Sequence, residues 1–208
     1  CRASNYIFLL RKALKNAGMG QVPVISVNLS GLEKNSGFQI TLPLLRRALA
    51  ALTYGDLLML LANQTRPYEK NPGETDAHVD HWVQEICGQF LKGKGFQPKA
   101  IKAQLRQIVA DFETVEILPV RKVKVGIVGE IYVKYSSLAN NHLEDFLVSQ
   151  GCEVVVPGLM GFIGLMIENH LEDARLYGKG GAVLVASKVA GWYVERIEKK
   201  MRRVLIES

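Results

Sequence analysis

Residues 122–129, KVKVGIVG, alternate in polarity and then become continuously apolar. Such a run is typical of a strand that enters the middle of a parallel sheet, where both faces are covered. Residues 151–158, GCEVVVPG, have the same character, and residues 139–149 between the two runs have helical spacing. The three segments predict a βαβ unit with the right-handed crossover that is usual for parallel strands.

Outside this unit the pattern is mainly helical. Apolar residues recur at helical spacing over residues 4–17, 39–63, 75–92, 98–114, 163–178 and 181–206. Residues 22–27, VPVISV, predict one further short strand. We therefore expect an α/β fold of Rossmann-like (flavodoxin-like) parallel sheet units with a substantial helical portion. Two lobes are expected: a helix-rich α/β lobe over residues 1–118 and a Rossmann-like lobe over residues 119–208.

The composition of the 208 residues is that of a globular protein, with 48% hydrophobic and 22% charged residues. No apolar run approaches the roughly 20 residues that span a bilayer, so no membrane segment is expected. The net charge of +6 is spread along the chain without interleaved aromatic residues, which argues against nucleic-acid binding. Three cysteines without a CxxC pair indicate a protein of a reducing compartment, which we expect to be the cytoplasm. Because Cys1 opens the chain without a leader pattern, we expect a fragment of a longer protein.

The first candidate site follows the strand at residues 122–129. Gly129 permits a sharp turn, and Glu130 is then expected at the sheet edge, where it could accept hydrogen bonds or a proton. Ligands bind beyond the carboxyl ends of parallel strands, but a capped turn without a ligand fits equally well. Residues 126–129 lack the GxGxxG pattern of a nicotinamide site, and no Walker A sequence occurs in the chain.

A second candidate site is the turn RPYE, residues 66–69. It could present Arg66 to a carboxylate or phosphate, or Arg66 could pair with Glu69 while Tyr68 buries its ring. Cys1 precedes a helix beside a cation, which would favour a thiolate and suits iron–sulfur ligation. Cys87 is expected in the core, because it shares a helical stripe with apolar residues.

Three stretches together resemble one known family. They are CRASNY at residues 1–6, RPYE at residues 66–69, and GIVGEIY at residues 126–132, which continues to Asn140 and Asn141. They occur in the same order in the acyl-CoA dehydratase activase-related proteins, which are related to the 2-hydroxyglutaryl-CoA dehydratase subunits. The resemblance extends over nearly the whole chain, although Ser137 stands where relatives commonly have Pro.

The resemblance implies a dehydratase-like module of a low-potential redox system of anaerobic metabolism. An ATP-hydrolysing activase would deliver electrons, the cofactor would be a [4Fe–4S] or double-cubane cluster, and the substrate would be a 2-hydroxyacyl-CoA or a related small molecule. Cys1 would be a cluster ligand, completed by residues outside these 208, and Glu130 is the candidate catalytic residue. The candidate substrate-binding residues are Arg66, Tyr68, Glu69, Tyr132, Asn140 and Asn141.

Two other functions stay open at this point. The chain could be a non-catalytic docking module for the activase, or a small-molecule sensor with two lobes. An oligomer is possible in each case. All site predictions share one geometric expectation, that Cys1, Arg66 and Glu130 converge on a crevice between the lobes.

Overall fold

The computed structural model describes residues 5–24, 41–178 and 181–207. The chain divides into two compact units, residues 1–45 and 46–208. The first unit contains α1 (Tyr6–Asn16), which confirms the expected helix near the start of the chain. Gly18 follows α1 with a φ of 73° and donates its amide to Lys15 O, so it ends the helix as a left-handed residue. Residues 25–27 of the strand expected at residues 22–27 lie outside the described residues, and residues 22–24 are not in a strand.

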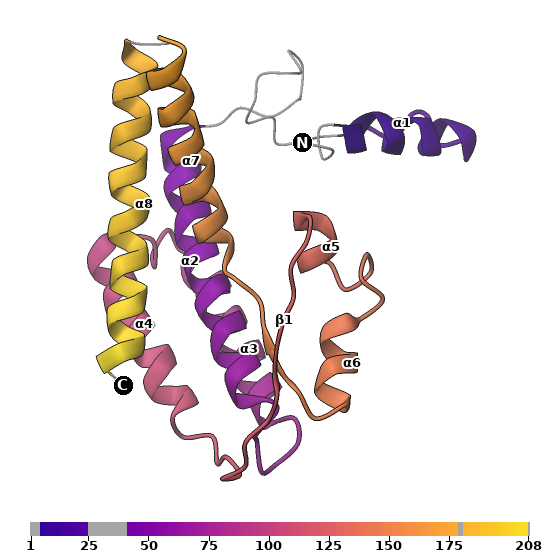
Figure 1. The fold of residues 1–208 in the computed structure, drawn as a ribbon, viewed down its shortest axis with the longest axis vertical. Helices are drawn as coiled ribbons and strands as arrows, with labels where there is room; N and C mark the ends of the chain where they lie inside the picture. The colour runs from indigo at the N-terminus through magenta and orange to yellow at the C-terminus, as the bar shows by residue number, and fades with distance from the viewer. Residues whose placement is uncertain (1–4, 25–40, 179–180, 208) are drawn as a thin grey trace. The chain divides into compact units, whose positions relative to one another are not determined.

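The second unit is dominated by helices (Figure 1), and the described chain is 67% helical. Its long helices are α2 (Leu42–Thr65, whose first residues belong to the first unit), α3 (Glu74–Leu91), α4 (Pro98–Phe112), α7 (Leu159–Leu176) and α8 (Ala182–Glu207). Pro98 occupies the first turn of α4, where a missing amide proton is tolerated.

The sheet consists of two short parallel strands, β1 (Lys124–Gly126) and β2 (Glu153–Val155). Lys124 lies opposite Glu153, and Gly126 opposite Val155. Two short helices, α5 (Ile131–Tyr135) and α6 (Leu143–Ser149), connect the strands. The parallel pair with a helical connection is as predicted.

The prediction of an α/β fold with Rossmann-like (flavodoxin-like) parallel sheet units is wrong. Within the described residues, β1 and β2 pair only with each other, and each has three residues. The apolar runs are long enough to form strands, but the longer helices bury their apolar faces mainly against one another. The unit is therefore a helical assembly that carries a small sheet.

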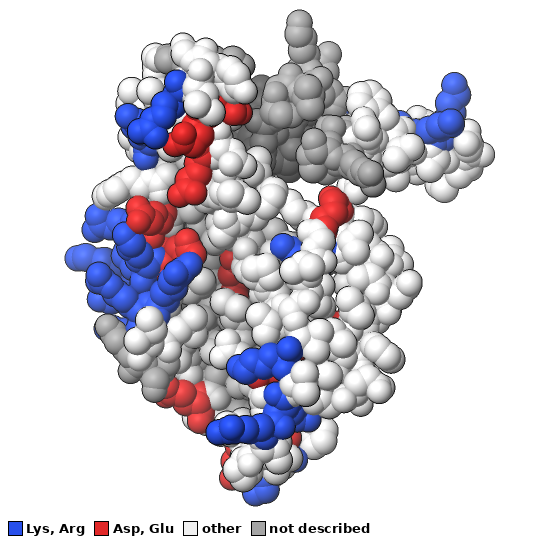
Figure 2. Space-filling view, viewed as in Figure 1, with Lys and Arg blue, Asp and Glu red and all other residues white. Residues whose placement is uncertain are grey.

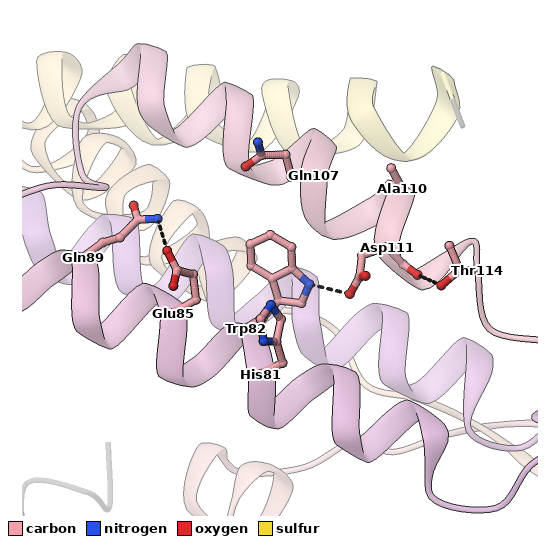
Figure 3. A pocket seen from close by; sticks show the side chains of 8 residues that line it. All are labelled: His81, Trp82, Glu85, Gln89, Gln107, Ala110, Asp111 and Thr114. Carbon is pink, nitrogen blue, oxygen red and sulfur yellow. Dashed lines mark hydrogen bonds between the residues drawn. The ribbon is translucent and has the colours of Figure 1, made fainter.

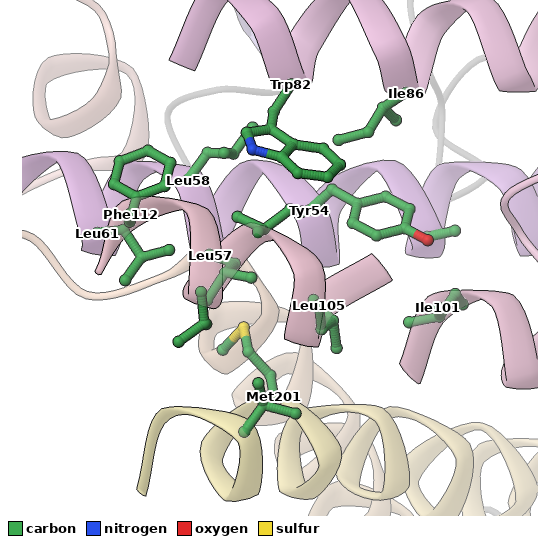
Figure 4. Close-up of a cluster of buried hydrophobic side chains, with 14 residues drawn as sticks. Tyr54, Leu57, Leu58, Leu61, Trp82, Ile86, Ile101, Leu105, Phe112 and Met201 are labelled. Carbon is green, nitrogen blue, oxygen red and sulfur yellow. The ribbon is translucent and has the colours of Figure 1, made fainter. Parts of the chain in front are cut away.

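The largest core cluster lies among α2, α3, α4 and α8 (Figure 4). On α4 the apolar face is buried in this cluster, and it includes Ile101, Leu105, Ile108 and Phe112. On α3 the buried apolar residues are Trp82 and Ile86, whereas Val83 and Cys87 are exposed. The expectation that Cys87 is a core thiol is therefore wrong, because α3 turns the Trp82 side toward α2 and α4.

Two smaller clusters complete the core. Leu49 of α2, Met160 of α7, and Val194 and Ile197 of α8 form one of them. Ile127, Val154 and Val156 form the other, and Met59 of α2 packs against them. Met201 of α8 belongs to the largest cluster, so residues on both sides of the expected lobe boundary at residue 118 share one core. The boundary itself stays a prediction.

Among the described helices, none combines the length and the apolar character that crossing a membrane requires.

Candidate functional site

The RPYE turn is joined to the sheet through one buried carboxylate. Tyr68 donates its hydroxyl proton to Glu153 Oε2 at 2.7 Å, and Lys124 Nζ donates to Glu153 Oε1 at 2.9 Å. Glu153 is only 4% exposed. The turn also pairs with the chain before β1, because Leu118 N donates to Tyr68 O and Lys70 N donates to Glu116 O. Two of the motifs that carry the resemblance therefore belong to one connected structure.

The electrostatics of this joint favour an ionised Glu153. Burial alone would raise the pKa of Glu153, but the hydrogen bonds from Tyr68 and Lys124 and the charge of Lys124 together hold it below its ordinary value. The same contacts raise the pKa values of Tyr68 and Lys124, mainly through their hydrogen bonds to Glu153. The joint is thus a charge-assisted link rather than a proton-transfer pair at neutral pH.

Glu69 begins α3. Its two carboxylate oxygens accept the amide protons of Gly73 at 2.7 Å and of Thr75 at 2.8 Å. The first amides of a helix have no partner within it, so this carboxylate satisfies two of them. Burial acts to raise the pKa of Glu69, and its contacts with Thr75 and Gly73 lower it overall. Glu69 therefore has a clear role in the fold of α3.

Arg66 binds α3 rather than its neighbour in the turn. Its Nε and Nη2 both donate to Asp76 Oδ1, at 2.9 and 2.5 Å. The Arg66 charge also acts on Glu144, in the first turn of α6, where burial raises the pKa of the carboxyl and Arg66 opposes the rise. Arg66 thus lies within electrostatic range of the segment that holds Asn140 and Asn141.

Glu130 caps the start of α5. Its Oε2 accepts the amide protons of Tyr132 at 3.0 Å and Val133 at 3.4 Å, at the start of α5. The Tyr132 side chain is 48% exposed. At the other end of α5, the hydroxyl of Tyr135 donates to Pro157 O, which fastens this loop to the chain after β2. Glu130 and Tyr132 therefore lie together at the carboxyl end of β1, where a ligand would be expected in an open sheet.

Asn140 and Asn141 form the turn before α6. Asn140 Oδ1 accepts the amide proton of Leu143 at 3.1 Å, and Asn141 is exposed with a left-handed φ of 56°. Asn adopts this conformation more readily than most residues. The Asn140 side chain thus has a structural role, while Asn141 is open to solvent.

Asp56 is a buried carboxylate outside the motifs singled out in the sequence. It lies on α2 and accepts the amide protons of Leu159 and Met160 at the start of α7, both at 2.8 Å. Burial raises its pKa, and the two amides oppose that rise. A Cβ on Gly158 would lie 2.5 Å from Asp56 Oδ2, so only glycine leaves room for this contact.

An open hollow of about 550 Å³ lies between α3 and α4 (Figure 3). His81, Trp82, Glu85 and Asp111 are among its lining residues. Asp111 Oδ2 is shared by Trp82 Nε1 at 2.8 Å and His78 Nδ1 at 2.6 Å, so His78 is bound to a carboxylate. None of the predicted site residues lines this hollow.

An iron–sulfur cluster has no site among the described residues. Cys1, the predicted ligand, lies outside them. Cys87 is exposed on α3, and Cys152 is partly buried just before β2. The described part of the chain brings together no group of three or more His, Cys, Asp or Glu side chains that could hold a metal ion.

The expected convergence of Cys1, Arg66 and Glu130 stays a prediction, because Cys1 lies outside the described residues. The structure instead adds Glu153 and Asp56 as organising carboxylates. A signal for both was present, since each is a single acid within an otherwise apolar run. A buried acid must find donors, but the sequence does not say which ones.

Comparison of the chain with protein-family models, with curated proteins and with solved structures gives no match.

Proposed function

We propose that this chain is a dehydratase-like module of an activase-dependent, low-potential redox system. Its described residues would hold and position a 2-hydroxyacyl-CoA or a related small molecule. The observation that carries the proposal is the link from Tyr68 through Glu153 to Lys124, which joins the RPYE turn to the strand that leads into Glu130. Two motifs separated by more than fifty residues are thus connected to the same sheet through Glu153, as parts of one site would be.

The chemistry of the loop after β1 supports substrate positioning. Tyr132 and Asn141 are exposed, and Glu130 uses only one of its carboxylate oxygens in capping α5. The remaining oxygen could accept a hydrogen bond from a substrate hydroxyl or hold a proton. Ligands from outside the described residues would hold the cluster, and the activase would deliver its electrons, as the resemblance implies.

A second candidate is a non-catalytic module that docks the activase. It is favoured by the use of the motif side chains in the fold, since Glu69, Glu130 and Asn140 all cap helices. A docking module needs these residues only for shape, so their replacement by close analogues would leave its binding unchanged.

The complete natural protein, purified anaerobically, separates these functions. We expect bound iron and acid-labile sulfide, and activase- and ATP-dependent dehydration of a 2-hydroxyacyl-CoA. Cys1→Ser should lower the iron content, whereas Glu130→Gln should lower turnover by roughly tenfold to a thousandfold with an unchanged unfolding midpoint. Glu168→Gln, on the exposed face of α7, is the matched control and should change neither.

Unchanged turnover in Glu130→Gln, with activase binding retained, would favour the docking module. Unchanged iron content in Cys1→Ser would remove Cys1 from the ligand set. Binding of a small molecule by a protein that contains no iron would instead support a sensor.

A further inference from the structure

A row of exposed residues runs along the outer side of α8. It consists of Val185, Val189, Trp192, Arg196, Lys199, Arg203 and Ile206, which we call the outer stripe. The apolar members are well exposed, with Val185 at 62%, Val189 at 60%, Trp192 at 56% and Ile206 at 82%. Exposed Trp and Val side chains in a row are unusual for a helix that has already buried one face.

The spacing of the outer stripe is that of a helix–helix seam. Successive members are four and three residues apart in alternation, which is the heptad pattern of helices that pack along their length. The other face of α8 already serves its own fold, because Val194, Ile197, Met201 and Val204 are buried against α2, α4 and α7. Thus α8 has two seams. The first is buried against α2, α4 and α7, and the second, the outer stripe, is left exposed by the described residues.

The two halves of the outer stripe differ in chemistry. Val185, Val189 and Trp192 form an apolar half, and Arg196, Lys199 and Arg203 form a cationic half, which ends at Ile206. Arg196 lies over the Trp192 ring at 5.1 Å, and Lys199 pairs with Glu195 at 2.5 Å. Figure 2 shows Lys and Arg gathered on this side of the molecule, over the C-terminal half of α8 and the neighbouring α4.

The exposed cations of α4 strengthen the positive charge of this region. Lys99 and Lys102 are exposed on α4, which packs against the C-terminal half of α8 through Ile101, Leu105 and Met201. The cationic half of the stripe therefore lies in a positive field, which an acidic partner would neutralise.

We propose that the outer stripe docks an amphipathic helix of a protein partner. That helix would present apolar residues to Val185, Val189 and Trp192, and Asp or Glu to Arg196, Lys199 and Arg203. Trp and Arg are the residues that most often dominate the affinity of protein interfaces, and here they are adjacent. The stripe spans residues 185–206, about 32 Å at 1.5 Å per residue, which is enough for a partner helix of about three heptads.

Charge argues against two other occupants. A second copy would place the cationic halves together if the helices were parallel, and would set apolar halves against cationic ones if they were antiparallel. A nucleic acid would place its phosphates against the exposed apolar side chains of Val185, Val189 and Trp192 in one half of the stripe. A partner helix with one apolar and one acidic half satisfies both parts of the stripe.

The test uses the whole chain and synthetic helical peptides of about three heptads. The peptides carry Leu at the seam positions of one half and Glu at those of the other, in both sequence orders, so that either helix direction is sampled. One order should shift the emission of Trp192 to shorter wavelength, since Trp82 is already buried. Affinity should fall at least about tenfold in Trp192→Ala and in the double variant Arg196→Glu, Arg203→Glu.

The matched control is the double variant Lys92→Glu, Lys94→Glu, which makes the same charge change at exposed lysines between α3 and α4 and should keep full affinity. A peptide with Lys in place of Glu should bind only the Arg196→Glu, Arg203→Glu variant. The proposal is overturned if neither Glu peptide binds, or if the Arg196→Glu, Arg203→Glu variant binds the Glu peptide with unchanged affinity. It is equally overturned if sedimentation shows self-association through the stripe, or if a 20-nucleotide DNA binds there instead of the peptides.

Discussion

At the scale of single residues, three of the polar side chains singled out in the sequence are hydrogen-bond acceptors at helix starts. Glu69, Glu130 and Asn140 each accept backbone amide protons at the beginning of α3, α5 and α6. A cap of this kind typically contributes about 1 kcal/mol. A capped turn after β1 was one of the two alternatives that the sequence left open, and Glu130 provides the cap of α5.

The first prediction concerns Glu153. Because its pKa lies below the ordinary value of 4.5, its ionised form stabilises the fold above that pH. This contribution is lost as the pH falls through the lowered pKa of the folded state. Glu153→Gln should therefore lower the free energy of unfolding at pH 7 by about 1–3 kcal/mol and reduce its dependence on pH below about 4.5. Urea unfolding at pH 7 and in the acid range measures both effects.

Two further variants check the cause. Glu113→Gln, at an exposed position, should leave the acid dependence as it is in the natural protein. Tyr68→Phe removes one donor, so the pKa of Glu153 should rise and acid unfolding should begin at a higher pH. If Tyr68→Phe unfolds over the same pH range as the natural protein, the hydroxyl does not lower that pKa.

At the scale of elements, the contact between α2 and α7 depends on a carboxylate and a glycine. Asp56 holds the first amides of α7, and Gly158 leaves the space for it. Periodicity in the sequence predicted both helices, but it gave no sign that an acid in one would cap the other. A residue in the middle of a helix has no local reason to bond a chain segment about one hundred residues away.

The second prediction follows from that contact. Gly158→Ala would place a methyl group 2.5 Å from Asp56 Oδ2, so the carboxylate must move from the amides of Leu159 and Met160. We expect a loss of about 1–3 kcal/mol in the free energy of unfolding. Gly161→Ala is the matched control, since nothing lies within 4 Å of its Cβ and it is exposed on α7.

Because alanine favours a helix over glycine, Gly161→Ala should be neutral or more stable by up to about 1 kcal/mol. Equal stability of the two variants in thermal or urea unfolding would show that Asp56 adjusts without cost.

At the scale of the whole molecule, the second unit is organised by α8, which returns to pack on α2 and α4. Met201 is 6% exposed within the cluster that includes Leu57 and Leu105. The expected boundary at residue 118 separates these residues in sequence. The shared core nevertheless makes the stability of the N-terminal helices of this unit depend on its last helix.

The third prediction tests this dependence. Met201→Ala should lower the free energy of unfolding by about 2–5 kcal/mol, because it leaves a cavity among α2, α4 and α8. Ile206→Ala, five residues further along α8 and 82% exposed, should change it little. Hydrogen exchange should show lower protection in α2 and α4 of Met201→Ala. A loss confined to α8 would mean that residues before and after 118 unfold separately.

The sequence by itself determined most of the helices. The spacing of apolar residues fixes which segments can bury a stripe, and the start of α4 follows from Pro98. It also indicated two parallel strands with a helical connection, because β-branched runs favour extended backbone. The extent of the sheet was overestimated, since a strand requires neighbours, and a short run does not specify where they come from.

Only the tertiary structure decided how the motif residues are used. Whether Arg66 binds Glu69 or Asp76, and which donors reach Glu153, depends on the packing of distant segments. The same holds for the two faces of α8, whose buried seam is chosen by α2, α4 and α7 and whose outer stripe remains exposed. Local sequence specifies the side chains, but burial and partners arise only when remote parts of the chain meet.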